Sequence, residues 1–415
     1  MIFMTMALAL QPLYLRKVLG LARDNAGFVN ANIQVITELV DLLSVAYLGY
    51  LSDRIGRIPV VYYGFILAGI SALLLPFSLE LGVMTGLGGL TFVYLFRSSM
   101  SLGTTAVWPQ IATLAGDFAD GAASMRHDSA EAYRLRPRLL AKAGFMMAFG
   151  ATLVYTVLMQ IPQQAGVVVA MALMAGFAFA GGWIARCFLV DVAPKVRVDR
   201  IPLRAILQLL RQEEKLRLSF YSAFTSRNDM VIIGLFLMTW AIYFADVLGV
   251  SHVQAAAQAG MVIGFIGLMV LLTVNIWGEL ILRLGRVPAM VLGLFLSGAG
   301  FAGMGFIVNP LGGWVFVPAF LVGVGQAGCL LAPQVTTMDL APVAMRGSVL
   351  GVFNTVGCLG IIFFLQAGGL LFDWLGPNAP FVFTGIANFI IMFYGLLLLR
   401  KKTAQSSGAR ILEEV

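Results

Sequence analysis

The stretch from Gly49 to Pro59 reads GYLSDRIGRIP, and a second stretch from Gly278 to Pro288 reads GELILRLGRVP. Six of the eleven positions are identical, and Ile58 is matched by Val287. Each stretch joins two long apolar segments, and the two copies lie about half the chain length apart. A basic turn repeated at this distance is typical of membrane transporters that are built from two homologous halves.

The composition indicates the same class of protein without the repeat. Hydrophobic residues make up 60% of the 415 positions and charged residues only 11%, whereas a soluble globular chain has about 25% charged residues. The apolar stretches are about 20 residues long, which suits membrane-spanning helices and exceeds the length of barrel strands. The net charge of +7 resides in short loops, so we interpret it as cytoplasmic retention of basic loops and expect no nucleic-acid partner.

Twelve apolar segments are long enough, or nearly so, to be membrane helices. We expect them at 1–15, 27–50, 59–79, 84–108, 139–161, 165–187, 230–248, 256–277, 288–308, 313–333, 347–371 and 379–399. The first is short, and a truncated or misassigned start explains this better than a genuine short span. The fold class is therefore an all-α membrane protein with two six-helix halves. The predicted divisions are 1–190, a linker at 191–229, a second half at 230–400 and a tail at 401–415.

The distribution of Lys and Arg predicts the orientation of the chain. With an even number of spans, one side of the membrane holds nearly all basic residues, and the other has only Arg16, Lys17 and Arg23. Basic loops stay in the cytoplasm, so both termini and the linker are expected there, in a bacterial inner membrane or a membrane derived from it. Within the linker, leucines alternate with charged residues between positions 203 and 218. This pattern predicts an amphipathic helix at the inner membrane surface or a rod coupling the halves.

The first copy of the repeat fits the pattern G-x-L-x-D-R-x-G-R, and in this it resembles the loop signature of the major facilitator superfamily. The resemblance implies an inner gate in which Asp53 contacts the start of the eleventh helix at Arg346. Arg54 or Arg57 would pair with Asp117. In the second copy Leu282 replaces the acid, and Asp339 could serve Arg283 or Arg286. The turn glycines of the two copies complete the expected gate, namely Gly49, Gly56, Gly278 and Gly285.

The second apolar segment carries polar side chains on one face. Asn30, Gln34, Thr37, Glu38 and Asp41 follow helical spacing. A carboxylate at membrane depth is costly unless it faces water, a partner or a bound cation, so Glu38 and Asp41 are candidates for proton coupling or cation binding. The alternative is structural: Asp41 would belong to the inner gate and Glu38 would line the outer vestibule.

Arg97 is the one cation that we expect deep in the bilayer, near the middle of the fourth segment. It resembles the Arg of a superfamily motif R-x-x-x-G, although Ser101 stands where the motif has glycine. Arg97 could bind an anionic group, adjust the proton affinity of Glu38 or Asp41, or form a fixed ion pair. The sequence leaves these three roles open.

Four other polar or aromatic residues are candidates for a central cavity, and helix packing explains each of them equally well. They are Trp240, Tyr243, Gln326 and Asn354. No phosphate loop, nucleotide fingerprint, zinc pair or nucleophile elbow is present in the sequence. We therefore expect a non-enzyme without a cofactor, and the sequence does not decide whether a metal binds.

These patterns favour a secondary active transporter that moves a small solute by alternating access and is coupled to protons or ions. A stretch from Asn30 to Leu42 resembles superfamily members of magnetosome-forming bacteria, which are linked to iron handling, so efflux or transport of iron or another metal ion is one alternative. Drug efflux is a second, although the fifth segment lacks the proline of drug antiporters. A membrane assembly or sensing protein without transport is a third. The expected partners are a small molecule or ion and the lipid bilayer, with the protein a monomer.

Overall fold

The computed structural model describes residues 1–111, 114, 145–190, 203–342 and 346–413; the side chains of residues 46, 53, 346, 347 and 402–413 lie outside this description. Every regular element in the described part is helical. Large apolar side chains on these helices, such as Leu43, Val83 and Phe393, are exposed. Such a surface suits contact with lipid, so the all-α membrane fold expected from the sequence is confirmed.

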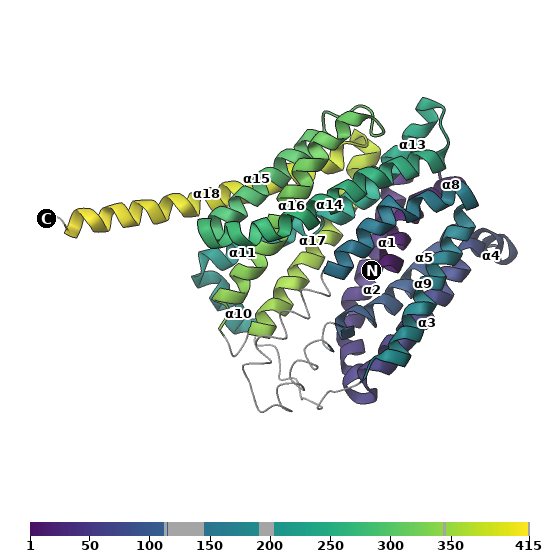
Figure 1. Ribbon diagram of the computed structural model, residues 1–415, viewed down its shortest axis with the longest axis horizontal. Helices are drawn as coiled ribbons and strands as arrows, with labels where there is room; N and C mark the ends of the chain where they lie inside the picture. Colours follow the sequence, from purple (N-terminus) through teal and green to yellow (C-terminus); the bar gives the residue numbers. More distant parts are fainter. Residues whose placement is uncertain (112–113, 115–144, 191–202, 343–345, 414–415) are drawn as a thin grey trace. The chain divides into compact units, whose positions relative to one another are not determined.

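The described part of the N-terminal half is helical (Figure 1). Its elements are α1 (Ile2–Lys17), η1 (Arg23–Asn25), α2 (Ala26–Ile55), α3 (Arg57–Leu74), η2 (Leu75–Phe77), α4 (Ser78–Thr85), α5 (Gly89–Thr105), helical residues 145–156, η3 (Leu158–Gln160), α8 (Ile161–Ala165) and α9 (Val167–Phe188). α3 packs against α9 and α5, while α2 packs against α5. Glycine makes the closest of these contacts possible, because a Cβ on Gly103 would lie 2.6 Å from the carbonyl oxygen of Gly64.

The C-terminal half has longer helices. They are α10 (Leu203–Gln212), α11 (Glu214–Ser226), α12 (Asp229–Ile232), the π-helical turn η4 (Ile233–Leu237), α13 (Met238–Leu248), α14 (His252–Leu284), α15 (Arg286–Met304), η5 (Gly313–Val315), α16 (Phe316–Leu340), α17 (Arg346–Leu375) and α18 (Ala379–Glu413). α15 packs against both α16 and α18, and α11 packs against α16, α17 and α18.

Ten helical segments of the described chain are long and apolar enough to cross a membrane. α1 with 16 residues and α5 with 17 residues occupy the two remaining predicted positions. Each of the twelve predicted segments thus contains a helix in its described residues. The third is longer than predicted, because the helix continues through η2 into α4 and ends at Thr85.

The seventh segment begins earlier than its predicted start at 230. The candidate span runs from Glu214 to Leu248, because α11 is not a surface helix: Leu216, Leu218 and Ser219 are fully buried. The alternation of charged and apolar residues looked amphipathic over the whole range 203–218, yet only α10 retains that surface character. The charged residues of α11 cluster in its first turn, and the remainder enters the helix bundle.

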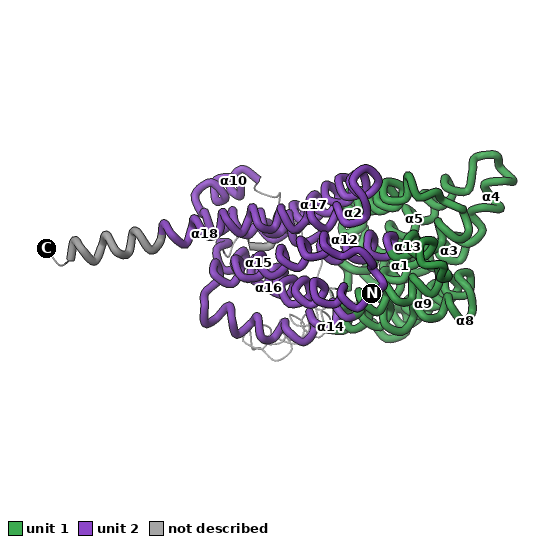
Figure 2. Tube along the Cα trace, turned by 90° about the horizontal axis from the view of Figure 1, so that it is seen from above, with its two compact units in different colours: residues 1–198, 241–264 green, residues 199–240, 265–415 purple. Residues whose placement is uncertain are grey.

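The chain forms two compact units (Figure 2). Unit 1 contains residues 1–198 and 241–264, and unit 2 contains residues 199–240 and 265–415. The end of α13 and the start of α14 therefore belong to the same unit as the N-terminal helices. In unit 1, a Cβ on Gly260 would lie 2.7 Å from the carbonyl oxygen of Tyr155, and Gln160 donates a hydrogen bond to the carbonyl oxygen of Ala257 at 3.4 Å.

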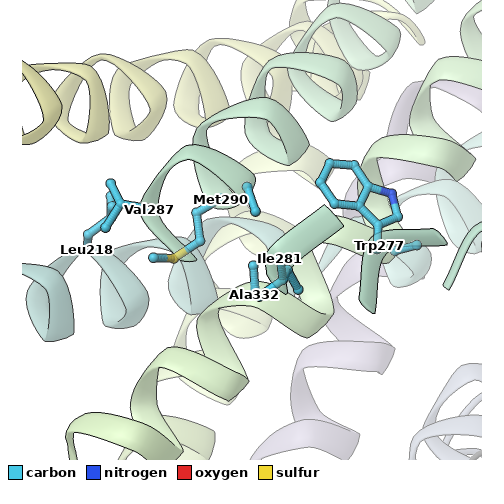
Figure 3. Packing of buried hydrophobic residues seen from close by; sticks show 8 residues of the cluster. Leu218, Trp277, Ile281, Val287, Met290 and Ala332 are labelled. Carbon is cyan, nitrogen blue, oxygen red and sulfur yellow. The ribbon is translucent and has the colours of Figure 1, made fainter. Parts of the chain in front are cut away.

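The two repeated turns have the same backbone conformation. Gly56 ends α2 with φ at 98°, and Gly285 follows α14 with φ at 88°. Residues with a Cβ rarely adopt this region, so glycine is the residue that suits both turns. Around the second turn, Leu218, Trp277, Ile281, Val287, Met290 and Ala332 pack from four helices (Figure 3). The Trp277 indole donates a hydrogen bond to the Val324 carbonyl oxygen at 2.7 Å, which fixes α14 against α16.

Candidate transport site

A buried polar network links α1, α2 and α5 within unit 1. The Arg97 guanidinium donates hydrogen bonds from Nε to Gln11 Oε1 at 3.1 Å and from Nη2 to Gln34 Oε1 at 2.8 Å. Gln11 in turn donates to the Asn30 carbonyl oxygen at 3.0 Å and to Asn30 Oδ1 at 3.2 Å. Arg97 and Gln11 are buried, and Asn30 is fully buried. Three helices are therefore held together by one guanidinium and its amide partners.

The two acids of α2 are connected to this network differently. Gln34 donates a hydrogen bond to Glu38 Oε1 at 3.2 Å, so an amide lies between Glu38 and Arg97. Asp41 Oδ1 accepts hydrogen bonds from the hydroxyls of Ser101 and Thr105 on α5. The Thr37 carbonyl oxygen lies 2.9 Å from Ser101 Oγ and is an alternative acceptor for the same hydroxyl hydrogen. The structure thus brings together the predicted residues Asn30, Gln34, Glu38, Asp41 and Arg97.

The electrostatics of this network depend on Arg97. Both carboxylates interact with its positive charge, but the described hydrogen-bond partners of Asp41 are neutral hydroxyls. A carboxyl held by hydroxyls can be stabilised in either protonation state, because a hydroxyl both donates and accepts. The side chains of both acids are partly exposed.

A second polar cluster in unit 1 joins the end of α1 to the α13–α14 turn. Asp246 accepts hydrogen bonds from Arg16 Nη2 at 2.7 Å and contacts His252 Nε2 at 2.7 Å. The Arg16 guanidinium also lies over the Tyr243 ring, 5.0 Å from its centroid, and Tyr243 donates to the Leu21 carbonyl oxygen at 2.9 Å. We call Arg16, Tyr243, Asp246 and His252 the Asp246 cluster. The cluster could not be predicted from the sequence, because Arg16 lies more than 200 residues from the other three members.

Four contacts of the predicted gate residues are described, and each lies within one half of the chain. Arg54 lies over the Tyr50 ring at 4.7 Å, and Arg57 reaches Gln110 Oε1 at 3.5 Å. In the second half, Arg283 pairs with Glu279 at 2.7 Å and Arg286 pairs with Asp339. Of the two arginines considered for Asp339, it is therefore Arg286 that makes the contact. Gly49 and Gly278 have open space beside them. The side chains of Asp53 and Arg346, and the whole of Asp117, lie outside the described residues.

The remaining predicted candidates do not converge on one site. Trp240 is buried and packs against Phe381 at 6.2 Å between ring centroids. Tyr243 belongs to the Asp246 cluster. Asn354 accepts a hydrogen bond from Arg227 at 2.6 Å, and Gln326 is buried with no hydrogen-bond partner for Oε1 in the described chain. No group of three or more His, Cys, Asp or Glu side chains suited to a metal ion occurs among the described residues.

Two functional candidates were missed in the sequence. Gln11 was not among the predicted site residues, yet it accepts a hydrogen bond from Arg97. Asp229 was placed at the end of the linker, but it is fully buried in unit 2 and bonded to Ser297 on α15. Asn388, a lone amide in an apolar segment, was the available signal for this second group, because buried amides require partners.

The comparison with known proteins agrees with this architecture. A family model described as Major Facilitator Superfamily matches residues 1–365. The chain belongs to the Major Facilitator Superfamily. A variant of the nucleoside transporter NupG has the same fold, with a TM-score of 0.71, 13% identity, and coverage of 95% of this chain and 96% of that chain.

Two curated relatives confirm the resemblance to magnetosome-associated members. Magnetosome protein MamH of Paramagnetospirillum magneticum is 49% identical over 98% of this chain and 92% of its own length. Magnetosome protein MamZ of Magnetospirillum gryphiswaldense is 36% identical over 95% of this chain, which spans only 60% of MamZ. The family and fold indicate a multi-pass membrane transporter rather than an enzyme, working in lipid on a small molecule or ion.

Proposed function

We propose that this protein is a secondary active transporter in which Asp41, Glu38 or both carry the coupling proton. The observation behind this is the contact of Asp41 with the hydroxyls of Ser101 and Thr105, while Arg97 is bonded to amides. A permanent ion pair would leave no proton-binding group, whereas a carboxyl on neutral partners can bind and release a proton. Movement of Arg97 toward either acid would favour proton release.

The Asp246 cluster supports alternating access. By the Lys/Arg distribution, Arg16 lies on the outer side of the membrane. The cluster then acts as a closed outer gate that fastens the α13–α14 turn to α1. The predicted inner gate would be its counterpart on the cytoplasmic side. We further propose a monomer in the bacterial inner membrane or a derived membrane, with both termini cytoplasmic and two six-helix halves.

Transport of iron or another metal ion is the second candidate. The names of MamH and MamZ place those relatives in magnetosomes, and the oxygen ligands around Asp41 suit hard cations. The positive charge of Arg97 close to the same carboxylates opposes a doubly charged ligand there. For this reason the proton role is the better supported one, and a metal ion remains a candidate for the transported substrate.

Proteoliposomes containing a pH-sensitive dye test the proposal. Fe²⁺, Mn²⁺ and a panel of labelled organic solutes are added singly, with and without a pH gradient. For the solute that moves, Asp41→Asn or Glu38→Gln should abolish accumulation driven by the gradient while solute exchange continues. Glu279→Gln is the matched control, since Glu279 is exposed and pairs with Arg283 within one helix. If both acid variants still accumulate solute against its gradient, these acids are structural.

A further inference from the structure

Unit 2 contains a buried carboxyl that no step of the proposed cycle uses. Asp229 begins α12 and is fully buried. Its Oδ2 accepts a hydrogen bond from the Ser297 hydroxyl on α15 at 2.9 Å, and Ser297 Oγ accepts one from Asn388 Nδ2 on α18 at 3.3 Å. Asp229, Ser297 and Asn388 thus form a chain of three buried polar side chains from three elements.

Several polar atoms at this place have no hydrogen-bond partner in the described chain. They are Asp229 Oδ1, Asn388 Oδ1 and both polar side-chain atoms of Asn228, which are all on fully buried residues. A buried polar atom without a partner destabilises the folded state, because it has lost its hydrogen bonds to water. Four such atoms on three neighbouring or linked residues indicate that the group binds something further.

No cation of the described chain lies within ion-pair distance of Asp229. Arg227, two residues earlier, donates instead to Asn354 on α17 at 2.6 Å. The titratable group that α16 contributes near Asp229 is Cys329, which is also buried. α15 and α18 contribute the neutral Ser297 and Asn388. An ionised carboxylate in such surroundings costs several kcal/mol, and a bound proton removes that charge.

The packing around the site restricts what can bind. A Cβ on Gly325 of α16 would lie 2.2 Å from the backbone nitrogen of Ser297. A Cβ on Gly293 of α15 would lie 3.1 Å from the backbone nitrogen of Cys329. α15 and α16 therefore approach closely beside Ser297 and Cys329. This close approach favours a proton over a hydrated metal ion or an organic solute.

The segment that follows Asp229 is an irregular helix that leads from one compact unit to the other. α12 continues into the π-helical turn η4, and the chain passes from unit 2 to unit 1 between Trp240 and Ala241. π-helical turns are rare and occur often at functional sites. A shift of α12 during exchange between conformations would alter the contact of Asp229 with Ser297 and open it to water.

We propose that Asp229, Ser297 and Asn388 form a proton-binding site in unit 2, separate from the acids of α2, and that its proton exchanges with water. The proposal adds a second protonation site to the proposed function. It does not depend on that function, because it holds even if Glu38 and Asp41 prove structural or the transported solute is never found.

Infrared spectroscopy of the purified full-length protein in lipid tests this without any substrate. A protonated carboxyl has a C=O stretch distinct from that of a carboxylate, and the stretch shifts to lower frequency when D₂O replaces H₂O. At neutral pH we expect a protonated-carboxyl band that is lost in Asp229→Asn and kept in Asp41→Asn and Asp339→Asn, whether or not the acids of α2 add bands of their own. In wild type the band should shift within minutes of transfer to D₂O.

Ser297→Ala provides a second variant in case Asp229→Asn does not fold. It removes the hydrogen bond to Oδ2, so the Asp229 band should move to higher frequency. The proposal is overturned if the Asp229-dependent signal is that of a carboxylate, or if the band stays unshifted in D₂O for hours. Loss of the band when NaCl is added to sodium-free protein would assign the site to Na⁺ instead and would also overturn it.

Discussion

Neutralising Asp246 should release the outer gate. Asp246→Asn removes the ion pair with Arg16 and weakens the contact with His252, both at 2.7 Å. It leaves the Arg16–Tyr243 contact and the Tyr243–Leu21 hydrogen bond in place. Because the Asp246 side chain is 46% exposed, solvent screens each contact to about 0.5–1 kcal/mol. The closed state should thus lose about 1–2 kcal/mol, which raises the open-to-closed ratio by about 5- to 30-fold.

The assay is labelling of a buried position next to the cluster. Val253, in the first turn of α14, is 8% exposed, so a Val253→Cys side chain should react with a membrane-impermeant maleimide only when the cluster opens. The background has Cys187, Cys329 and Cys358 replaced by alanine. Asp246→Asn should raise the labelling rate by about 5- to 30-fold. High salt screens the same ion pair, so it should reproduce part of this increase in the Val253→Cys protein that retains Asp246. Glu279→Gln should leave the rate unchanged.

A double-mutant cycle decides whether the contact itself is responsible. If Arg16 and Asp246 act through each other, Arg16→Gln should have little further effect in an Asp246→Asn background. Additive effects of the two changes, or an unchanged labelling rate in Asp246→Asn, would refute the assignment of this cluster as a gate.

Three further predictions follow from the site and the fold. Gln11→Leu leaves Arg97 Nε and the Asn30 amide oxygen without their hydrogen-bond partner. The midpoint of thermal unfolding should therefore fall, and gradient-driven uptake should decrease. Gln254→Leu, at the exposed start of α14, is the control and should change neither. Gly325→Ala places a Cβ 2.2 Å from the Ser297 nitrogen and should destabilise the purified protein by about 1–3 kcal/mol, measured against Gly278→Ala, which has open space. Asp53→Asn should impair turnover more than Leu282→Asn, because the second copy of the gate already lacks the acid; equal losses of transport would contradict an unequal gate.

Helices and turns that are specified by neighbouring residues could be predicted from the sequence. The repeated GRxP turns, the hydropathy and the twelve apolar segments depend on neighbouring residues, and each of the twelve contains a helix in its described residues. The stripe of Asn30, Gln34, Glu38 and Asp41 was also visible, because helical periodicity places these residues on one face. An interaction of Glu38 or Asp41 with Arg97 was also considered from the sequence, because charged side chains within a membrane need partners.

The tertiary structure decided which groups meet across long separations. Gln11 contacts Arg97, Asp246 contacts Arg16, and Asp229 bonds to Ser297, with sequence separations from 68 to 230 residues. No local pattern marks such pairs, because a single polar residue in an apolar helix has the same appearance whether it faces a partner or only ends a helix. The boundary of α11 shows the same limit: alternating charges looked like a surface helix, and only the packing against α16, α17 and α18 shows that it is buried. Sequence thus determined the helices and the class of protein, whereas burial by distant helices determined which polar side chains became candidates for function.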